Sequence, residues 1–159
     1  MAFLFLTFLI LALPEGYKAE DACFRVVGRV NCGSTEYVPV KVQLYDDDDN
    51  EDDLMTREFG YGRFPEGPTR ELTQGQSMIV SGCAWDFSSD ADPLLRLSKY
   101  SCNGKTSPVK IALDRSQCNY QLSQLKYDNK DVSKTVGTYQ CWGTKVFLNN
   151  GTLTQRNED

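Results

Sequence analysis

The 159-residue sequence contains no histidine. Without histidine, no Ser-His-Asp or Cys-His nucleophilic pair can be built, and no histidine-ligated zinc site can form. The sequence also lacks a basic excess, because 17 Lys and Arg face 22 Asp and Glu, a net charge of −5. A nucleic-acid binder usually carries a basic face, and no basic cluster is visible in the sequence. These absences exclude nucleic acid as the expected partner and leave few common enzyme mechanisms.

Long apolar runs are absent after the first residues. The sequence begins MAFLFLTFLILAL, a run that is too short to span a bilayer comfortably. We interpret residues 1–19 as a secretory signal peptide cleaved within residues 16–22, with a signal anchor as the alternative. No second run of spanning length follows, so we expect a secreted, extracellular protein with no transmembrane segment in its mature chain.

The sequence has no Cys-x-x-Cys pair, which argues against a zinc ribbon or a thioredoxin-like centre. Six cysteines follow the apolar run. An even number of cysteines behind a signal peptide predicts a disulfide framework, although the sequence leaves the connectivity open. The disulfide candidates are Cys23, Cys32, Cys83, Cys102, Cys118 and Cys141.

Alternating apolar residues predict short strands along the chain. Phe24, Val26 and Val30 share one parity, whereas Val27 breaks the pattern and is expected to face a second surface. Residues 77–85 predict a further strand. The remaining strand signals are Val38, Val40, Val42 and Leu44 alternating with Lys41 and Gln43, two strands joined around Asn103-Gly104, and one or two strands over residues 135–148.

Two segments show no clear strand pattern. Residues 54–76 carry four glycines and two prolines, and we predict an irregular segment with a short strand over residues 56–59. Residues 116–128 fit both helical and strand spacing, and we predict a short helix there. About seven short strands predict a single all-β sandwich domain at residues 23–148, followed by a frayed polar tail at residues 149–159.

Several short motifs follow one another in order: GRVNCG, VPVKVQLYDDD, DDLM, GRF, SG, DP and CNG. This succession, from Val26 to Leu113, resembles the transthyretin-like family of secreted proteins, which is large in nematodes. The resemblance implies a transthyretin-like (immunoglobulin-like) β-sandwich of two sheets with one short helix late in the chain. It implies little about activity, because this family is defined by fold and sequence rather than by a shared reaction.

The chain departs from the family pattern at three places. Residues 65–76 lengthen the connection after GRF, and Tyr100-Ser101 replace a histidine. The family commonly carries another cysteine soon after CNG, whereas the next one here is Cys118, so the disulfide pairings of the family do not transfer directly. Hydroxyisourate hydrolases of the same fold use histidines and a C-terminal Tyr-Arg-Gly-Ser motif, whereas this chain ends QRNED. The acid-base groups of that reaction are therefore missing. Nothing in the sequence argues for thyroid-hormone carriage.

The acidic run from Asp46 to Asp53 offers the oxygen ligands that calcium prefers. An EF-hand requires glycine at the sixth position of its loop, where Asp52 stands, and most charge runs are solvated loops. We therefore expect no cofactor and keep a looser calcium site as an alternative. Paired glycosidase carboxylates are a weaker hypothesis, because such groups must face each other across a cleft. The candidate calcium ligands are Asp47, Asp49, Glu51 and Asp53.

Two further features lie near the cysteines and the C-terminus. Asn150-Gly151-Thr152 is an N-glycosylation sequon, which predicts a glycan if the chain is secreted. Trp85 and Trp142 each lie within two residues of a cysteine, and we interpret them as core packing beside disulfides.

The glycine-rich segment carries one candidate contact surface. Tyr61, Arg63 and Phe64 would form an interaction patch if they are exposed, because Tyr, Phe and Arg favour interfaces. Together these observations predict a secreted protein that works by binding and not as an enzyme. Its partner is open between an extracellular protein, a lipid and a small ligand. The first alternative is a carrier of a small apolar ligand or lipid, and the second is a carboxylate-based hydrolase.

Overall fold

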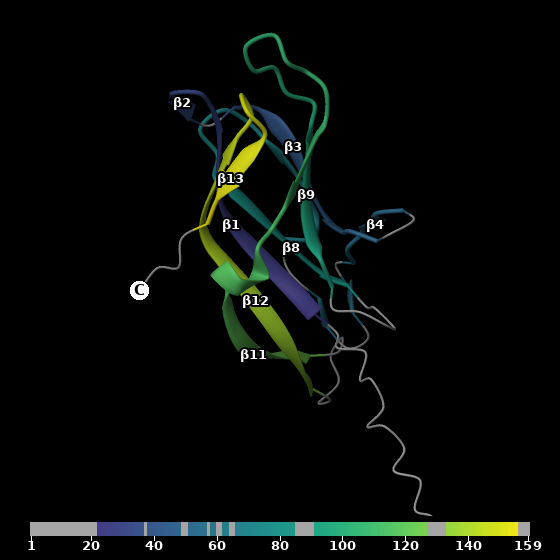
Figure 1. Cartoon of the computed structure of the whole chain (residues 1–159). Helices are drawn as coiled ribbons and strands as arrows, with labels where there is room; N and C mark the ends of the chain where they lie inside the picture. The colour runs from purple at the N-terminus through teal and green to yellow at the C-terminus, as the bar shows by residue number, and fades with distance from the viewer. Residues whose placement is uncertain are drawn as a thin grey trace, which may run out of the picture.

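The computed structural model describes residues 22–36, 38–48, 51–56, 58–59, 62–63, 66–84, 91–126 and 133–155. These residues form an all-β architecture of two main sheets, as the alternating patterns predict (Figure 1). The described helical structure is a single 3₁₀ turn, η1 (Arg115–Gln117). In this part of the chain, no helix has the length and apolar character to cross a membrane.

The larger sheet has six strands, with two long strands at its centre. β1 (Ala22–Cys32) and β12 (Ser133–Phe147) run parallel and side by side (Figure 1). β8 and then β2 pair with successive parts of β1, while β11 and then β13 pair with successive parts of β12. The bounds of these flanking strands are β2 (Thr35–Glu36), β8 (Met78–Ala84), β11 (Asn119–Lys126) and β13 (Thr152–Thr154).

The second sheet has five strands built around β3 (Val40–Asp46). β9 pairs with one edge of β3 and continues to β10, while β7 and β4 share the other edge. A separate two-stranded sheet joins β5 to β6. These strands are β4 (Asp53–Leu54), β5 (Glu58–Phe59), β6 (Gly62–Arg63), β7 (Thr69–Leu72), β9 (Pro93–Ser98) and β10 (Val109–Ala112).

The hydrophobic core lies between the two main sheets. Side chains alternate between the faces of a strand, so each strand contributes every second residue to the core. The predicted parities are confirmed for β1 and β3. Their core residues are Phe24, Val26 and Val30 from β1 and Val40, Val42 and Leu44 from β3, which meet Met78, Val80, Leu95, Leu97, Ile111 and Val146 from other strands.

Three segments differ from the sequence-based expectation. The short helix predicted over residues 116–128 is wrong: this segment forms β11, because antiparallel pairing with β12 decides between two spacings that the residues fit equally. Residues 54–76 contain β7, which pairs with Val40–Gln43 of β3. The tail at residues 149–159 is not frayed throughout, because Thr152–Thr154 pairs with β12 as β13.

All six cysteines form disulfides, as predicted. Cys23–Cys83 joins the neighbouring strands β1 and β8, and Cys118–Cys141 joins the start of β11 to β12. Cys32–Cys102 joins the end of β1 to the turn between β9 and β10, and so ties the two sheets together. Because Cys23–Cys83 and Cys32–Cys102 close loops of 60 and 70 residues, they restrict the unfolded chain strongly.

The parallel pairing of β1 with β12 contains a bulge. Val26 pairs with Cys141 and Gly28 with Thr144, so three steps along β12 match two along β1. Gly143 has a φ of 61°, which favours glycine. At Gly28 a Cβ atom would lie 1.9 Å from the carbonyl oxygen of Thr144. The bulge therefore requires the absence of a side chain at Gly28.

The variant Gly28→Ala tests this requirement. We expect it to lower the free energy of unfolding by about 2–3 kcal/mol or to prevent folding, since the added methyl group meets backbone atoms that cannot move away alone. Gly137→Ala is the matched control, because its Cβ would meet only the end of the half-exposed Tyr120 side chain. Urea denaturation with the disulfides intact measures both; equal losses would contradict the explanation.

Candidate functional site

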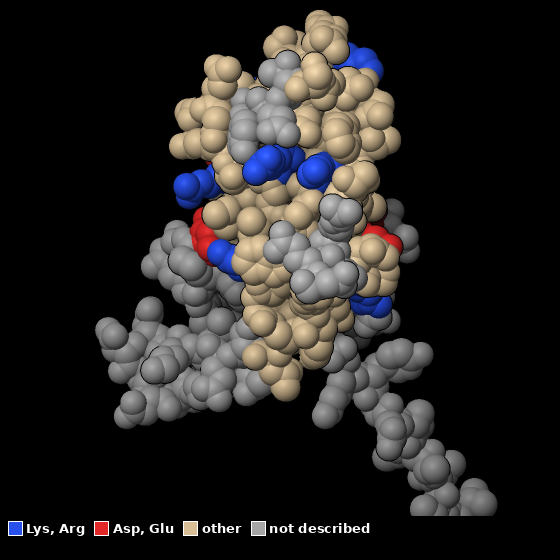
Figure 2. Space-filling view, turned by 90° about the vertical axis from the view of Figure 1, so that its left-hand side faces the viewer, with Lys and Arg blue, Asp and Glu red and all other residues tan. Residues whose placement is uncertain are grey.

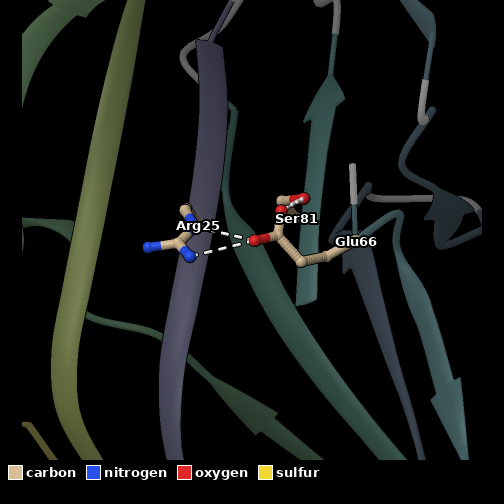
Figure 3. A network of polar contacts seen from close by, with 3 residues as sticks. All are labelled: Arg25, Glu66 and Ser81. Carbon is tan, nitrogen blue, oxygen red and sulfur yellow. Dashed lines mark hydrogen bonds and ion pairs between the residues drawn. The ribbon is translucent and has the colours of Figure 1, made fainter. Parts of the chain in front are cut away.

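A polar network links β1, β8 and the segment that precedes β7 (Figure 3). Nε and Nη2 of Arg25 donate to Oε1 of Glu66 at 3.2 and 2.9 Å, and the Ser81 hydroxyl donates to Oε2 at 3.0 Å. Arg25 and Ser81 are register partners on neighbouring strands. The side chains of Arg25 and Glu66 are 26% and 17% exposed, so their ion pair is only partly screened by water.

The environment of Glu66 favours its ionised form. Burial raises the pKa of this carboxyl, but the hydrogen bonds from Arg25, from its own backbone and from Ser81 outweigh burial and hold the pKa below its ordinary value of 4.5. Glu66 is therefore a carboxylate at neutral pH and balances the charge of Arg25. A general acid requires the opposite shift, so the direction of this shift argues against Glu66 as a general acid.

An open groove of about 380 Å³ lies at the bulge between β1 and β12. Trp142 lines this groove and is half-buried, so its interpretation as core packing is wrong. The bulge places this residue away from the core, where its ring lies 5.2 Å from the guanidinium carbon of Arg25, a cation–π distance. Val27 also lines the groove, which confirms that it faces a second surface. The lining residues are Val27, Gly28, Arg29, Ser77, Trp142, Gly143, Thr144 and Lys145.

The groove carries positive charge. Arg29 and Lys145 are register partners on the parallel pair, and both are exposed. No Asp or Glu is among the residues that line the groove. Figure 2 looks onto this side of the molecule and shows Lys and Arg side chains gathered across the middle of the face. The side chains that line the groove are therefore cationic or neutral, although the chain as a whole is negative.

The first residue of the acidic run has a structural role. Asp46 is buried at the end of β3, where its Oδ1 accepts a hydrogen bond of 2.8 Å from the backbone amide of Asp92. The amide of Asp47 donates in turn to the carbonyl of Asp92 at 2.9 Å. This reciprocal contact fixes the start of β9 against the end of β3. It also places the LYD segment beside the DP segment in the fold.

The other acids of the run do not form a metal site among the described residues. Asp52 pairs with Lys110, and the hydrogen bond from this lysine is the main cause that lowers the pKa of Asp52. Of the candidate calcium ligands, Asp47, Glu51 and Asp53 are exposed, and Asp49 lies outside the described residues. Within the described ranges, no group of three or more His, Cys, Asp or Glu is arranged to hold a metal ion. Calcium binding stays a hypothesis.

The sequon lies in the exposed turn between β12 and β13. Oδ1 of Asn150 accepts hydrogen bonds from the hydroxyl of Thr152 at 2.7 Å and from its amide at 3.3 Å. Asn150 is exposed, which leaves its amide group accessible to a modifying enzyme.

The interaction patch predicted at Tyr61, Arg63 and Phe64 stays a prediction. Tyr61 and Phe64 lie outside the described residues, and only the backbone of Arg63 is described, in β6.

Sequence reasoning missed the groove residues Arg29, Trp142 and Lys145 as a group. Arg29 and Lys145 lie more than a hundred positions apart, and only the parallel register brings them together. Gly143 was the available signal, because a glycine inside a strand pattern indicates a bulge or a close backbone approach. Trp85, the other tryptophan beside a cysteine, lies outside the described residues.

Glu66→Gln tests the polar network. Because the pKa of Glu66 is below 4.5 in the folded protein, its stabilising effect is complete above that pH and is lost as the pH falls through the folded value. We expect the variant to lose about 1–3 kcal/mol of unfolding free energy at pH 7, since Arg25 keeps its charge without a carboxylate partner. The variant should also lose less stability than the parent on acidification below pH 4.5.

Glu71→Gln is the control for this measurement. Glu71 likewise pairs with a cation, Lys99, and has a lowered pKa, but both of these side chains are exposed. We expect it to change stability little at neutral pH, because water screens the pair. Chemical denaturation between pH 3 and 7 measures both variants. Equal behaviour of the two would contradict a special role for Glu66.

Asp46→Ala tests the structural role of the first acid. It leaves the backbone amide of Asp92 without its acceptor in a partly buried contact, a loss of about 1 kcal/mol. Asp46→Asn retains an acceptor oxygen and should lose less. Asp53→Ala, at an exposed position of the same run, should be close to neutral. Thermal unfolding compares the three, and a loss at Asp53 equal to that at Asp46 would overturn this assignment.

Asn150→Gln tests the sequon. Expressed through a eukaryotic secretory pathway, the parent should carry an N-linked glycan that an amidase removes, and the variant should lack it. Thr152→Ser keeps the sequon and should keep the glycan. Intact-mass spectrometry distinguishes the forms. A parent chain without a glycan, or a variant that retains one, would refute the prediction.

Compared with known proteins, the chain matches no protein-family model, no curated protein and no solved structure.

Proposed function

We propose that this chain is a secreted binding protein of the transthyretin-like family, and that it binds through the outer face of its larger sheet. The observation that carries the proposal is the groove at the β1–β12 bulge. An open concave surface with a half-buried tryptophan and two exposed cations is the composition expected of a contact surface, since Trp and Arg are enriched where proteins bind partners.

Three features support the secreted location. Disulfides form and persist in oxidising compartments, and all six cysteines are paired. The apolar N-terminal run has the length of a signal h-region. The sequon is exposed and lies in a turn. Three disulfides would be unusual in a reducing compartment, and together the three features favour secretion.

The two-sheet architecture and the positions of the motif residues support the family assignment. Gly82, in the SG motif, packs where a Cβ would lie 2.7 Å from the Cβ of Met55, in the DDLM motif. Asp46 and Asp92 join the LYD and DP motifs in the same way. The motifs therefore record packing requirements of one fold, as expected of a family defined by its architecture.

The described carboxylates favour binding over catalysis. Asp46 accepts from a backbone amide, and Glu66 is held ionised by Arg25 and Ser81. A carboxylate-based hydrolase needs two facing acids with pKa values pushed apart. The hydrogen bonds to Asp46 and Glu66 described above come instead from an amide, an arginine and a serine. The network beside the groove instead positions a cation against an aromatic ring, which suits recognition.

The proposal is tested by mapping where ligands contact the secreted, isotopically labelled protein. A panel of sulfated glycans, anionic and neutral phospholipid vesicles, small organic acids and calcium is titrated while backbone amide shifts are recorded. We expect shifts concentrated in Val27–Arg29 and Trp142–Lys145. Binding that shifts only the opposite sheet, or no binding by any member, would contradict the proposed surface. Retention of the chain inside cells after expression from its full coding sequence would contradict secretion.

A further inference from the structure

β11 leaves one edge of the larger sheet open. Among the described strands it pairs with β12 alone, and it does so along all eight of its residues. Figure 1 shows β11 at the margin of the sheet, on the far side of β12 from β1. An edge strand presents a row of unpaired N–H and C=O groups that can pair with a strand of another chain. β11 therefore offers a backbone surface for strand pairing.

The other marginal strands that the structure describes are short or engaged. β2, β4 and β13 have two or three residues each, and β7 and β10 have four. β8 is longer, but its outer edge is occupied where Cys83 pairs with Thr56. Proteins protect sheet edges by shortness, by charge and by cover. β11 lacks this protection, because it is long and its one charged residue, Lys126, stands at its end.

β11 also carries two uncovered apolar side chains. Tyr120 and Leu122 are 52% and 68% exposed. The ring of Tyr120 lies 5.2 Å from that of Tyr139, which stacks at 5.1 Å on the buried Phe24. Leu122 shares the face of Tyr120, and its register partner is Gly137, which has no side chain to cover it. A row of apolar side chains that begins in the core thus ends at the open edge.

We propose that β11 pairs antiparallel with β11 of a second copy of this chain, which forms a two-fold dimer with one continuous sheet. An axis at Gln121 places Tyr120 of each copy opposite Leu122 of the other, on the face where both are exposed. Aromatic and aliphatic side chains opposite each other stabilise a sheet. Although each copy has a net charge of −5, no like charges meet, because Lys126 then lies opposite Ser116. The strand is therefore complementary to itself.

Pairing through β11 leaves the groove at the bulge unobstructed along the sheet. β11 pairs with Ser133–Gln140 of β12, whereas the groove is lined by Trp142–Lys145 of the same strand. A dimer would present the groove twice, so a partner with repeated binding groups would be held more tightly than one with a single group. The contact itself involves a different surface and does not depend on the proposed function.

Sedimentation velocity of the full secreted protein measures the assembly. We expect a monomer–dimer equilibrium with the dimer populated at about 100 µM, and no larger species, because pairing uses the open edge of both copies. Leu122→Lys should weaken dimerisation at least about ten-fold, since it replaces an apolar contact with a charge. The variant should keep its fold, because the leucine is largely exposed in one copy.

Leu54→Lys is the matched control. Leu54 is also an exposed leucine, 43% exposed, but it lies in β4 of the second sheet. The same change there should leave dimerisation unaltered. A chain that stays monomeric at about 100 µM, or equal effects of the two substitutions, would overturn the inference.

Amide hydrogen exchange locates the contact. In β11, residues whose backbone groups bond to β12 alternate with residues whose backbone groups point to the open edge. The second set should exchange slowly at concentrations where the dimer forms and quickly after dilution, whereas the first set should stay protected at both. If the chain dimerises while exchange in β11 is independent of concentration, the contact lies elsewhere and the inference is wrong.

Discussion

The parallel contact between β1 and β12 is the constraint on which the rest of the structure depends. β1 pairs with β12 and β8, two segments distant in the sequence, and with β2, which follows it directly, so all three take their positions from it. At its middle, Gly28 allows the carbonyl of Thr144 to approach to a distance that no side chain would permit. At this close approach β12 has one residue more than β1, which forms the bulge. The bulge places Trp142 on the outer surface, in the groove. The groove and its charges are consequences of that one close approach.

The acidic run has a different meaning in the folded protein than its composition indicates. Its first residue, Asp46, is buried and holds the chain near Asp92. A later one, Asp52, pairs with Lys110 of β10. The most noticeable charges in the sequence thus take part in holding the second sheet together, while the candidate recognition surface lies on the other sheet and is positive.

Much of the fold could be predicted from the residues themselves. Alternation in β1, which Val27 interrupts, and in β3 identified their core faces. Asn103-Gly104 identified the turn between β9 and β10, where the backbones of Cys102 and Lys105 pair. β11 could not be predicted, because its residues satisfy two spacings and the neighbouring strand decides. β7 escaped prediction for a related reason: three of its four side chains are exposed, so it has no apolar pattern to reveal it.

The candidate site was less predictable than the fold. Cysteines and the sequon can be recognised from a few neighbouring residues, but Arg29 and Lys145 become neighbours only through the register of two strands distant in the sequence. The same holds for the disulfide pairs, since the sequence gives the cysteines and only the packed strands give the partners. Trp142 was assigned to the core because tryptophan beside a cysteine usually packs inside, and a single bulge was enough to reverse that.

The segment that precedes β7 has a consequence for how this protein can diversify. It delivers Glu66 to Arg25, and so it cancels a positive charge that lies beside the tryptophan. A chain with a shorter connection here would keep every groove residue and yet lose the carboxylate that balances the charge of Arg25. The length of this connection would then set the net charge beside Trp142, and with it the charge of the ligands that the surface attracts, while the residues of the groove stay the same.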